Sequence, residues 1–350
     1  MSGRRPLGAG RRRRPPAKVL ARRWGALLGG LGLAAGIPAA LASAPGARAR
    51  PASAGGAPSV GLAAALAPWR LPAPTSRPVV LALAGRIAVL GGLTVGDVST
   101  ASAVLVDPRT ARTARSSPLV EAVHDAAGAL LGGRAVVFGG GAAVSVATVQ
   151  SWQPGASRPI GELPTPRSDL GAATLGRRAY LVGGYDGASL PAEVLVTTNG
   201  ASFRPAGRLA QPVRYAAVAA YRGALWVVGG EVDASGTVET ADIQRFDPAT
   251  GTARVVGHLP VPLAGASAFV LGHRLYVAGG RLGATASARI WWIDTRHGVA
   301  RPAGFLPAGR ADAGVAVLGG RAYLVGGESL PSGQALRTAV VVRVVDIRRA

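Results

Sequence analysis

Two segments of the sequence combine residues that could bind a polar ligand. Arg167-Ser168-Asp169 and Arg310-Ala311-Asp312 each place a guanidinium two positions before a carboxylate. Such groups can hold a sugar or an anion through charge-assisted hydrogen bonds. They can equally neutralise one another and only order their own loops, because a surface ion pair contributes little energy. The residue types alone leave both roles open.

Other reaction chemistry lacks its usual residues in this chain. There is no Cys, which excludes thiol nucleophiles, disulfides and thiolate metal sites. The His residues are scattered rather than at metal-ligand spacing, and no Gly-x-Ser-x-Gly elbow or phosphate loop occurs. We therefore predict no catalytic residue, no metal site and no cofactor. His273 and His297 are expected to be solvated turn residues.

An internal repeat predicts the elements that position these side chains. A short apolar segment ends in Gly-Gly six times, and the first glycines are 44 to 50 residues apart. The pairs begin at Gly91, Gly139, Gly183, Gly229, Gly279 and Gly326. Each copy also holds an earlier apolar segment, a third strand that ends in a turn such as Asp247-Pro248, and a short fourth strand before a Leu-Pro or similar pair. This pattern indicates an all-β repeat fold.

The repeat resembles the kelch repeat over about residues 59–350. The resemblance implies a six-bladed β-propeller whose blades are four-stranded antiparallel sheets. One departure concerns the Trp that kelch repeats usually carry on the fourth strand. Phe203 stands there in one copy, and small or polar residues such as Ala253 stand there in others. Close kinship with the kelch adaptors of ubiquitin ligases is therefore not implied.

The ends of the repeat region indicate how the ring closes. The last copy has strands at Gly314 to Leu318, Arg321 to Val325 and about Thr338 to Asp346, which leaves too few residues for a fourth strand. Residues 59–70 form a spare segment before the first copy. We predict that this N-terminal strand completes blade six, which would leave only short protected edges.

Equivalent positions of all blades should converge around the central channel of a propeller. Counting back from the first glycine of each pair therefore identifies residues at the channel mouth. The predicted ligand-binding residues are Arg77, Asp125, Arg167, Asp169, Tyr215, Arg310 and Asp312. The loops after Gly-Gly, which begin at Tyr185, Glu231, Arg281 and Glu328 in four copies, are a second candidate surface because loops carry specificity on such scaffolds.

The charge of the chain limits the classes of partner. The formal net charge is +22, and the basic residues are scattered and mixed with acids outside the first 23 residues. A basic surface would favour anionic partners. No aromatic-rich basic stripe for stacking nucleic-acid bases is present, so we predict no nucleic-acid partner. The expected partner is a protein or a carbohydrate, with an anionic partner as one option.

The N-terminal residues have the pattern of an export signal. A basic leader precedes an uncharged apolar core at 24–37, and Ala40-Leu41-Ala42 supplies a small-x-small cleavage pattern. We predict a signal peptide at residues 1–42, a low-complexity linker at 43–58 and the propeller at 59–350. The alternative is a membrane anchor at residues 24–47 with the propeller outside, since uncharged sequence continues that far.

Two function classes remain open from the sequence. The first is a non-enzymatic extracytoplasmic binding or scaffold protein that recognises a protein or a carbohydrate through the propeller. The second is a sugar-active enzyme, such as a mutarotase similar to the bacterial sialic-acid epimerases, which the resemblance implies as an option. The enzyme would need an acid/base pair in the channel, for which the Arg and Asp residues above are the candidates. A propeller fold does not decide between these classes.

Overall fold

A computed structural model describes residues 60–346 of the chain. The described residues belong to one compact unit of the chain. The predicted signal peptide, linker and anchor lie outside the described residues. No helix that could span a membrane is found within residues 60–346.

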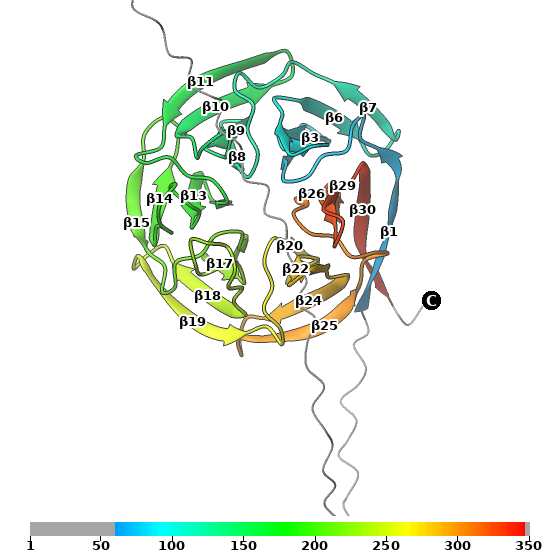
Figure 1. Cartoon of the computed structure of the whole chain (residues 1–350). Helices are drawn as coiled ribbons and strands as arrows, with labels where there is room; N and C mark the ends of the chain where they lie inside the picture. Colours follow the sequence, from blue (N-terminus) through cyan, green and yellow to red (C-terminus); the bar gives the residue numbers. More distant parts are fainter. Residues whose placement is uncertain (1–59, 347–350) are drawn as a thin grey trace, which may run out of the picture. The chain divides into compact units, whose positions relative to one another are not determined.

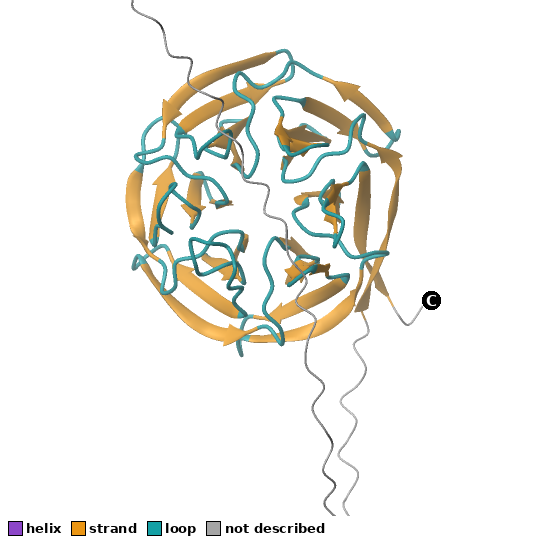
Figure 2. Cartoon of the chain, viewed as in Figure 1, coloured by secondary structure: helices purple, strands orange, loops and turns teal. Residues whose placement is uncertain are grey.

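Antiparallel pairing divides the long strands into six four-stranded blades, which are arranged around a central axis (Figures 1 and 2). Blade one contains β2 (Val79–Leu83), β3 (Arg86–Leu90), β6 (Ala103–Asp107) and β7 (Arg112–Arg115). Blade two contains β8 (Ala127–Leu131), β9 (Arg134–Phe138), β10 (Thr148–Gln153) and β11 (Ala156–Glu162). Blade three contains β12 (Gly171–Leu175), β13 (Arg178–Val182), β14 (Glu193–Thr197) and β15 (Arg204–Arg208). Blade four contains β16 (Ala217–Tyr221), β17 (Ala224–Val228), β18 (Asp242–Asp247) and β19 (Thr252–His258). Blade five contains β20 (Ser267–Leu271), β21 (Arg274–Ala278), β24 (Arg289–Asp294) and β25 (Val299–Phe305). Blade six contains β26 (Gly314–Leu318), β27 (Arg321–Val325), β30 (Thr338–Asp346) and β1 (Val60–Arg70). Short two-stranded ladders follow three of the Gly-Gly pairs: β4 (Leu93–Thr94) with β5 (Val98–Ser99), β22 (Arg281–Leu282) with β23 (Thr285–Ala286), and β28 (Glu328–Ser329) with β29 (Gln334–Ala335).

The N-terminal strand completes blade six, as predicted. β1 pairs antiparallel with β30, with Val60 opposite Asp346 and Leu66 opposite Val340. β30 pairs in turn with β27, and β27 with β26. The two ends of the described chain therefore share one blade, and Figure 1 shows them side by side on the ring.

The core lies between neighbouring blades because the second strand of each blade is apolar on both faces. After its first residue, β3 is buried at every position, and so are β9, β13, β21 and β27. Val79 and Leu90 of blade one pack with Val137 and Trp152 of blade two in one cluster. The fourth strands β11 and β19 contain only half-buried and exposed positions, as expected for the outer edge of a blade.

The Gly-Gly pairs allow the blades to approach closely. Gly229 has φ of +64°, and a Cβ on it would lie 2.1 Å from the carbonyl oxygen of Leu263 in the next blade. The amide of Gly230 donates a hydrogen bond to that same oxygen at 2.8 Å. Any side chain at Gly229 would therefore collide with the next blade, which explains why glycine recurs there.

Candidate functional site

Six equivalent residues form a closed ring of backbone hydrogen bonds at one end of the inner strands. Each amide donates to the carbonyl oxygen of the equivalent residue in the preceding blade, at 2.8–3.3 Å, and the bond from Arg77 N to Asp312 O closes the circle. The ring consists of Arg77, Asp125, Asp169, Tyr215, Gly265 and Asp312. All six have φ between +50° and +62°. We call this end of the propeller the mouth face; the predicted convergence of these positions is confirmed.

Left-handed backbone at this ring is unusual for the longer side chains. Asp tolerates this region of φ, whereas Arg and Tyr adopt it less readily, at a cost on the order of 1 kcal/mol each. Arg77 has φ of 55° and Tyr215 has φ of 54°. The surrounding hydrogen bonds hold the backbone in this conformation, and residues held so commonly mark functional sites.

The side chains of the ring join those of neighbouring residues in one network of charges. This mouth cluster contains Arg77, Asp125, Asp169, Arg214, Tyr215, Glu231, Arg281, Asp312 and Glu328. Arg77 links blades one, two and six: its Nη1 lies 3.1 Å from Asp125 Oδ2, and its Nε lies 3.1 Å from Glu328 Oε1. The Arg77 side chain is 22% exposed.

Two further arginines connect the acids of blades three, four and six. Arg214 Nη2 lies 2.9 Å from Asp169 Oδ2, and its Nε lies 3.3 Å from Glu231 Oε2. Arg281 Nη2 lies 2.8 Å from the other oxygen of Glu231, and its Nη1 lies 2.6 Å from Asp312 Oδ2. Each guanidinium bridges two carboxylates from different parts of the ring, so the network ties the blades together at the mouth.

Tyr215 lies among these charges. Its hydroxyl donates to Asp125 Oδ2 at 3.1 Å and accepts from Arg77 Nη1 at 3.3 Å. The guanidinium carbons of Arg77, Arg214 and Arg281 lie 5.5, 4.8 and 4.7 Å from the centre of its ring, within the range of cation–π attraction. Burial and the neighbouring Asp125 raise the pKa of the Tyr215 hydroxyl well above its ordinary value. The phenol is therefore a neutral hydrogen-bonding group here.

The loops after Gly-Gly belong to the same site. Their first residues pair by β-bridges with the residues just before the ring: Tyr185 with Ser168, Glu231 with Arg214, Arg281 with Ala264 and Glu328 with Ala311. These bridges bring three of the four side chains into the mouth cluster, and they place Tyr185 5.0 Å from the Arg214 guanidinium carbon. The two candidate surfaces from the sequence are thus one surface.

A cavity of about 140 Å³ lies against the ring. Its lining combines the ring residues with Pro78, Ala126, Leu170, Ala216, Ala266 and Ala313, which follow them in the chain. The lining therefore contains both polar and apolar side chains. That combination suits a ligand group that has both a polar and an apolar side, such as a sugar ring or a long cationic side chain.

Arg167 and Arg310 do not belong to this site, and their predicted place at the channel mouth is wrong. Arg167 is buried, and its Nη1 donates to the carbonyl oxygen of Glu193 at 2.9 Å. Arg310 is buried too; it donates to Gly326 O, and to Thr338 O at 3.0 Å. Burial lowers the pKa of Arg310 to about 10. These arginines satisfy carbonyl groups of their own blades, so their role is structural.

Protonation of the mouth cluster depends on burial. Burial, together with the nearby charge of Asp125, raises the pKa of Asp169 from 3.8 to about 7, although Arg214 opposes the shift. Burial also raises the pKa of Glu328. Carboxylates outnumber guanidiniums in the cluster by five to three. Even with Asp169 protonated, the cluster keeps a net negative formal charge.

Sequence reasoning did not assign Arg214 or His124 to the site. Both immediately precede ring residues, so the same count from Gly-Gly, taken one position earlier, would have found them. His124 Nδ1 lies 2.8 Å from Ser99 Oγ, and its Nε2 lies 3.7 Å from Asp125 Oδ2. Burial lowers its pKa, which favours the neutral ring. Within residues 60–346 no group of three or more His, Asp or Glu side chains could hold a metal ion.

Comparison with known proteins agrees with this architecture. A family model described as "Kelch motif" matches residues 262–299. A human protein, "Kelch repeat and BTB domain-containing protein 13", is 34% identical over 125 residues, which are 34% of this chain and 27% of that protein. "Kelch repeat protein M-T8" of Myxoma virus is 31% identical over 122 residues, 33% of this chain and 22% of that protein. The repeats are kelch repeats.

A solved structure, titled "Structure of YjhT", shares the fold of this chain. It aligns with a TM-score of 0.67 over 79% of this chain and 98% of that chain, at 16% identity. Identity this low shows the fold alone. The kelch chain described here spans only about a quarter of the length of these two curated relatives. The activities and partners of those proteins do not transfer with the repeats.

Proposed function

We propose that this kelch protein is a non-enzymatic binding protein that recognises a protein or a carbohydrate at the mouth face. The observation that carries the proposal is the mouth cluster itself. Ionisable side chains of the ring from blades one, two, three, four and six line one cavity. Gly265 stands at the equivalent position of blade five. The side chains of Arg77, Arg214 and Arg281 stay 14–22% exposed, so a partner can contact them.

The charge of the cluster indicates which chemical group it would accept. Because carboxylates exceed guanidiniums, a positively charged or hydroxyl-bearing group is favoured over an anion at this face. A Lys or Arg side chain of a protein and the hydroxyl or amino groups of a sugar both meet that requirement. The anionic partner that total charge suggested is therefore not the partner we propose for the mouth.

The size of the cavity limits how a partner is held. At about 140 Å³ it is smaller than the roughly 300–1,000 Å³ of typical small-molecule pockets. It can admit one group of a partner rather than a whole large ligand. The remaining contacts would come from the loops that begin at Tyr185, Glu231, Arg281 and Glu328, which surround the ring. This arrangement suits the end of a glycan or a projecting side chain of a protein.

Binding of the full chain to an array of neutral and amino sugars and to Lys- or Arg-containing peptides tests the proposal. Tyr215→Phe removes one hydroxyl that contacts Asp125 and Arg77, and Asp312→Asn removes one charge that faces Arg281. Each variant should weaken binding about 10- to 100-fold, the scale of a lost hydrogen bond to a charged group. Asp107→Asn, on the opposite face, is the matched control. Binding that survives both mouth variants would exclude the mouth as the site.

One observation favours the enzyme as a second candidate. A carboxyl whose pKa is about 7, as for Asp169, can donate or accept a proton near neutral pH. Arg214, 2.9 Å away, could stabilise charge that develops on a sugar oxygen. A sugar mutarotase would then lose anomer exchange, measured by NMR, in Asp169→Asn while still binding the sugar. Exchange by the wild type that does not exceed the rate in buffer would exclude this candidate.

We also propose that the protein works outside the cytoplasm. The support is the order of basic leader, apolar core and Ala40-Leu41-Ala42 in the sequence. Exported material should begin near Ser43 when its N-terminus is sequenced. An intact Met1 in a membrane fraction would instead identify residues 24–47 as an anchor.

A further inference from the structure

The face opposite the mouth is rich in unpaired arginine. There the first strand of each blade turns into the second, and we call this end the turn face. Every one of these turns carries at least one Arg, and none carries a carboxylate; the residues are Arg86, Arg134, Arg177, Arg178, Arg222, Arg274 and Arg321. All are exposed except Arg274, which is half-buried. Within residues 60–346 none of the seven forms an ion pair with a carboxylate.

Acids on the turn face do not neutralise these arginines. Asp107, Asp247 and Asp294 lie there at the ends of third strands, but each already contacts a basic residue of its own hairpin. The contacts are Asp107 with Arg109 at 3.6 Å, Asp247 with Arg245 at 3.3 Å, and Asp294 with His297 at 2.9 Å and Arg301 at 3.6 Å. The propeller therefore has a basic turn face and an acidic mouth cluster.

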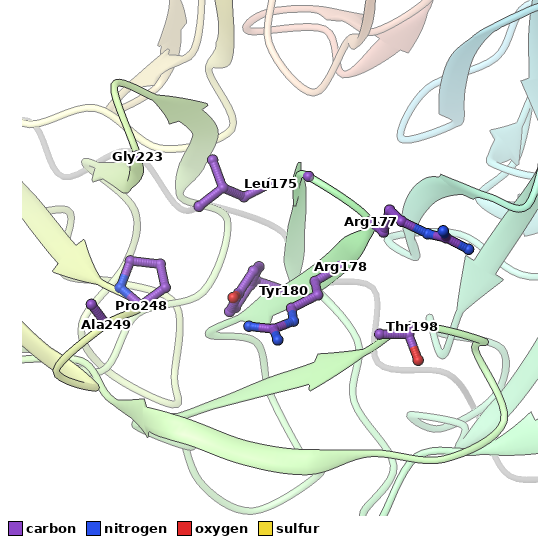
Figure 3. Close-up of a pocket in the computed structure, with 9 residues that line it drawn as sticks. Leu175, Arg177, Arg178, Tyr180, Thr198, Gly223, Pro248 and Ala249 are labelled. Atoms are coloured by element: carbon purple, nitrogen blue, oxygen red, sulfur yellow. The ribbon is translucent and has the colours of Figure 1, made fainter.

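Hollows between neighbouring blades open on the turn face beside these arginines. One hollow, of about 880 Å³, lies between blades three and four and is lined by Arg177, Arg178, Tyr180 and Thr198 among others (Figure 3). A hollow of about 380 Å³ has Arg134 in its lining, and one of about 280 Å³ has Arg222 and Arg274 together with Trp292. Each can place an anionic group beside a guanidinium.

The chain enters the fold at the turn face. Arg321, which begins its strand there, pairs with Arg343 of β30, and Arg343 pairs with Ala63 of β1. Val60 lies three residues earlier on β1, at the same end. Val60, the first described residue, therefore lies on the basic side of the propeller. In the sequence, twelve residues separate it from the uncharged stretch 24–47.

We propose that the turn face docks on an anionic lipid bilayer and that the mouth face points away from it. A broad set of arginines contributed by all six blades matches a flat surface with many phosphates better than a single linear polymer. The hollows between blades would receive lipid headgroups, and guanidiniums pair well with phosphate. The entry of the chain on the same side agrees with a membrane there. This docking is independent of what the mouth face binds.

The full chain, mixed with vesicles of phosphatidylcholine alone or with phosphatidylglycerol, tests the proposal. Hydrogen exchange should show protection of the turns 84–86, 132–134 and 319–321 on the anionic vesicles only, and salt should reverse it. This readout is local, so attachment through the N-terminal residues does not produce it. The variant Arg86→Gln/Arg134→Gln/Arg321→Gln should lose turn protection, with about a hundred-fold lower affinity of this face for the anionic surface.

A matched variant separates the turn face from net charge. Arg70→Gln/Arg115→Gln/Arg208→Gln removes the same charge from exposed fourth-strand ends on the mouth side and should keep the turns protected. Equal loss in both triple variants, or unprotected turns in the wild type, would overturn the proposal. The proposal would also be overturned if soluble polyphosphate displaced the vesicles and protected the same turns from hydrogen exchange to the same extent. If the turn-face triple variant does not fold, its three single variants serve the same comparison.

Discussion

Asp169 shows how one carboxyl responds to its place in the ring. It is buried, faces Arg214 and lies near Asp125, and its pKa is raised to about 7. In the native state it therefore holds a proton that the unfolded chain releases near its ordinary pKa of 3.8. Between pH 3.8 and about 7, the native state thus binds more protons than the unfolded state. The contribution of Asp169 to the free energy of unfolding is therefore fully present below about pH 4 and declines as pH rises to about 7.

The variant Asp169→Asn should remove this pH dependence because an amide imitates the protonated acid. Urea unfolding of wild type and variant at several values between pH 4 and 8 measures the effect. The wild type should lose stability relative to the variant as pH rises, on the order of 1.4 kcal/mol for each unit of pKa shift, with no further relative change above about pH 7. Parallel curves for the two proteins would show that Asp169 titrates normally.

At the scale of elements, the end of the second strand controls the distance between blades. Gly229 has φ of +64° and would bring a Cβ to 2.1 Å from Leu263 O, whereas Gly223, in a turn, has φ of +76° with no atom within 4 Å of its ideal Cβ. The two glycines thus share a backbone conformation but differ in their surroundings. Only the first requires close approach as well as positive φ.

This pair gives a matched test of the blade contact. Gly223→Ala should cost about 1 kcal/mol, the scale of left-handed strain at one residue. Gly229→Ala should cost clearly more, about 3 kcal/mol or more, because backbone of two blades must separate as well. Denaturant unfolding of both variants compares them directly. Equal losses would mean that the blades can adjust at no cost.

At the scale of the whole molecule, β1 closes the ring and carries part of the core. Trp69 at its end and Leu71 just after it are 4% and 1% exposed, and they pack with Tyr323 of blade six and with Val80 and Val104 of blade one. Arg337 Nε donates to Leu71 O at 3.0 Å, which adds a link across the seam. Loss of β1 would expose β30 as an open edge.

Deletion of residues 59–72 should therefore destabilise the whole propeller rather than one end. Burial of Trp69 and Leu71 alone is worth on the order of 4 kcal/mol, and the lost pairing with β30 adds to it. Thermal melting followed by Trp fluorescence and circular dichroism measures the loss. Deletion of residues 1–42, which leaves β1 intact, is the control. A truncated chain that melts like the control would mean that the ring does not depend on β1.

The architecture could be predicted from the sequence because it depends on periodic, local signals. The spacing of Gly-Gly predicted the repeated blades, the alternation of apolar segments predicted their strands, and the spare segment at 59–70 predicted the closing strand. Counting from Gly-Gly also found the ring, since equivalent backbone positions of a propeller must converge. Arg77, Asp125, Asp169, Tyr215 and Asp312 were identified in this way.

Only the tertiary structure decided what the side chains do, because their directions depend on neighbours far away in the chain. Arg167 and Arg310 stand only two residues before the ring, yet their backbone turns them into their own blades, where carbonyl groups need donors. Bridges between loops brought Glu231, Arg281 and Glu328 to the ring from the far side of each Gly-Gly. The raised pKa of Asp169 comes from burial among charges of several blades, and the basic turn face comes from folding dispersed arginines onto one end.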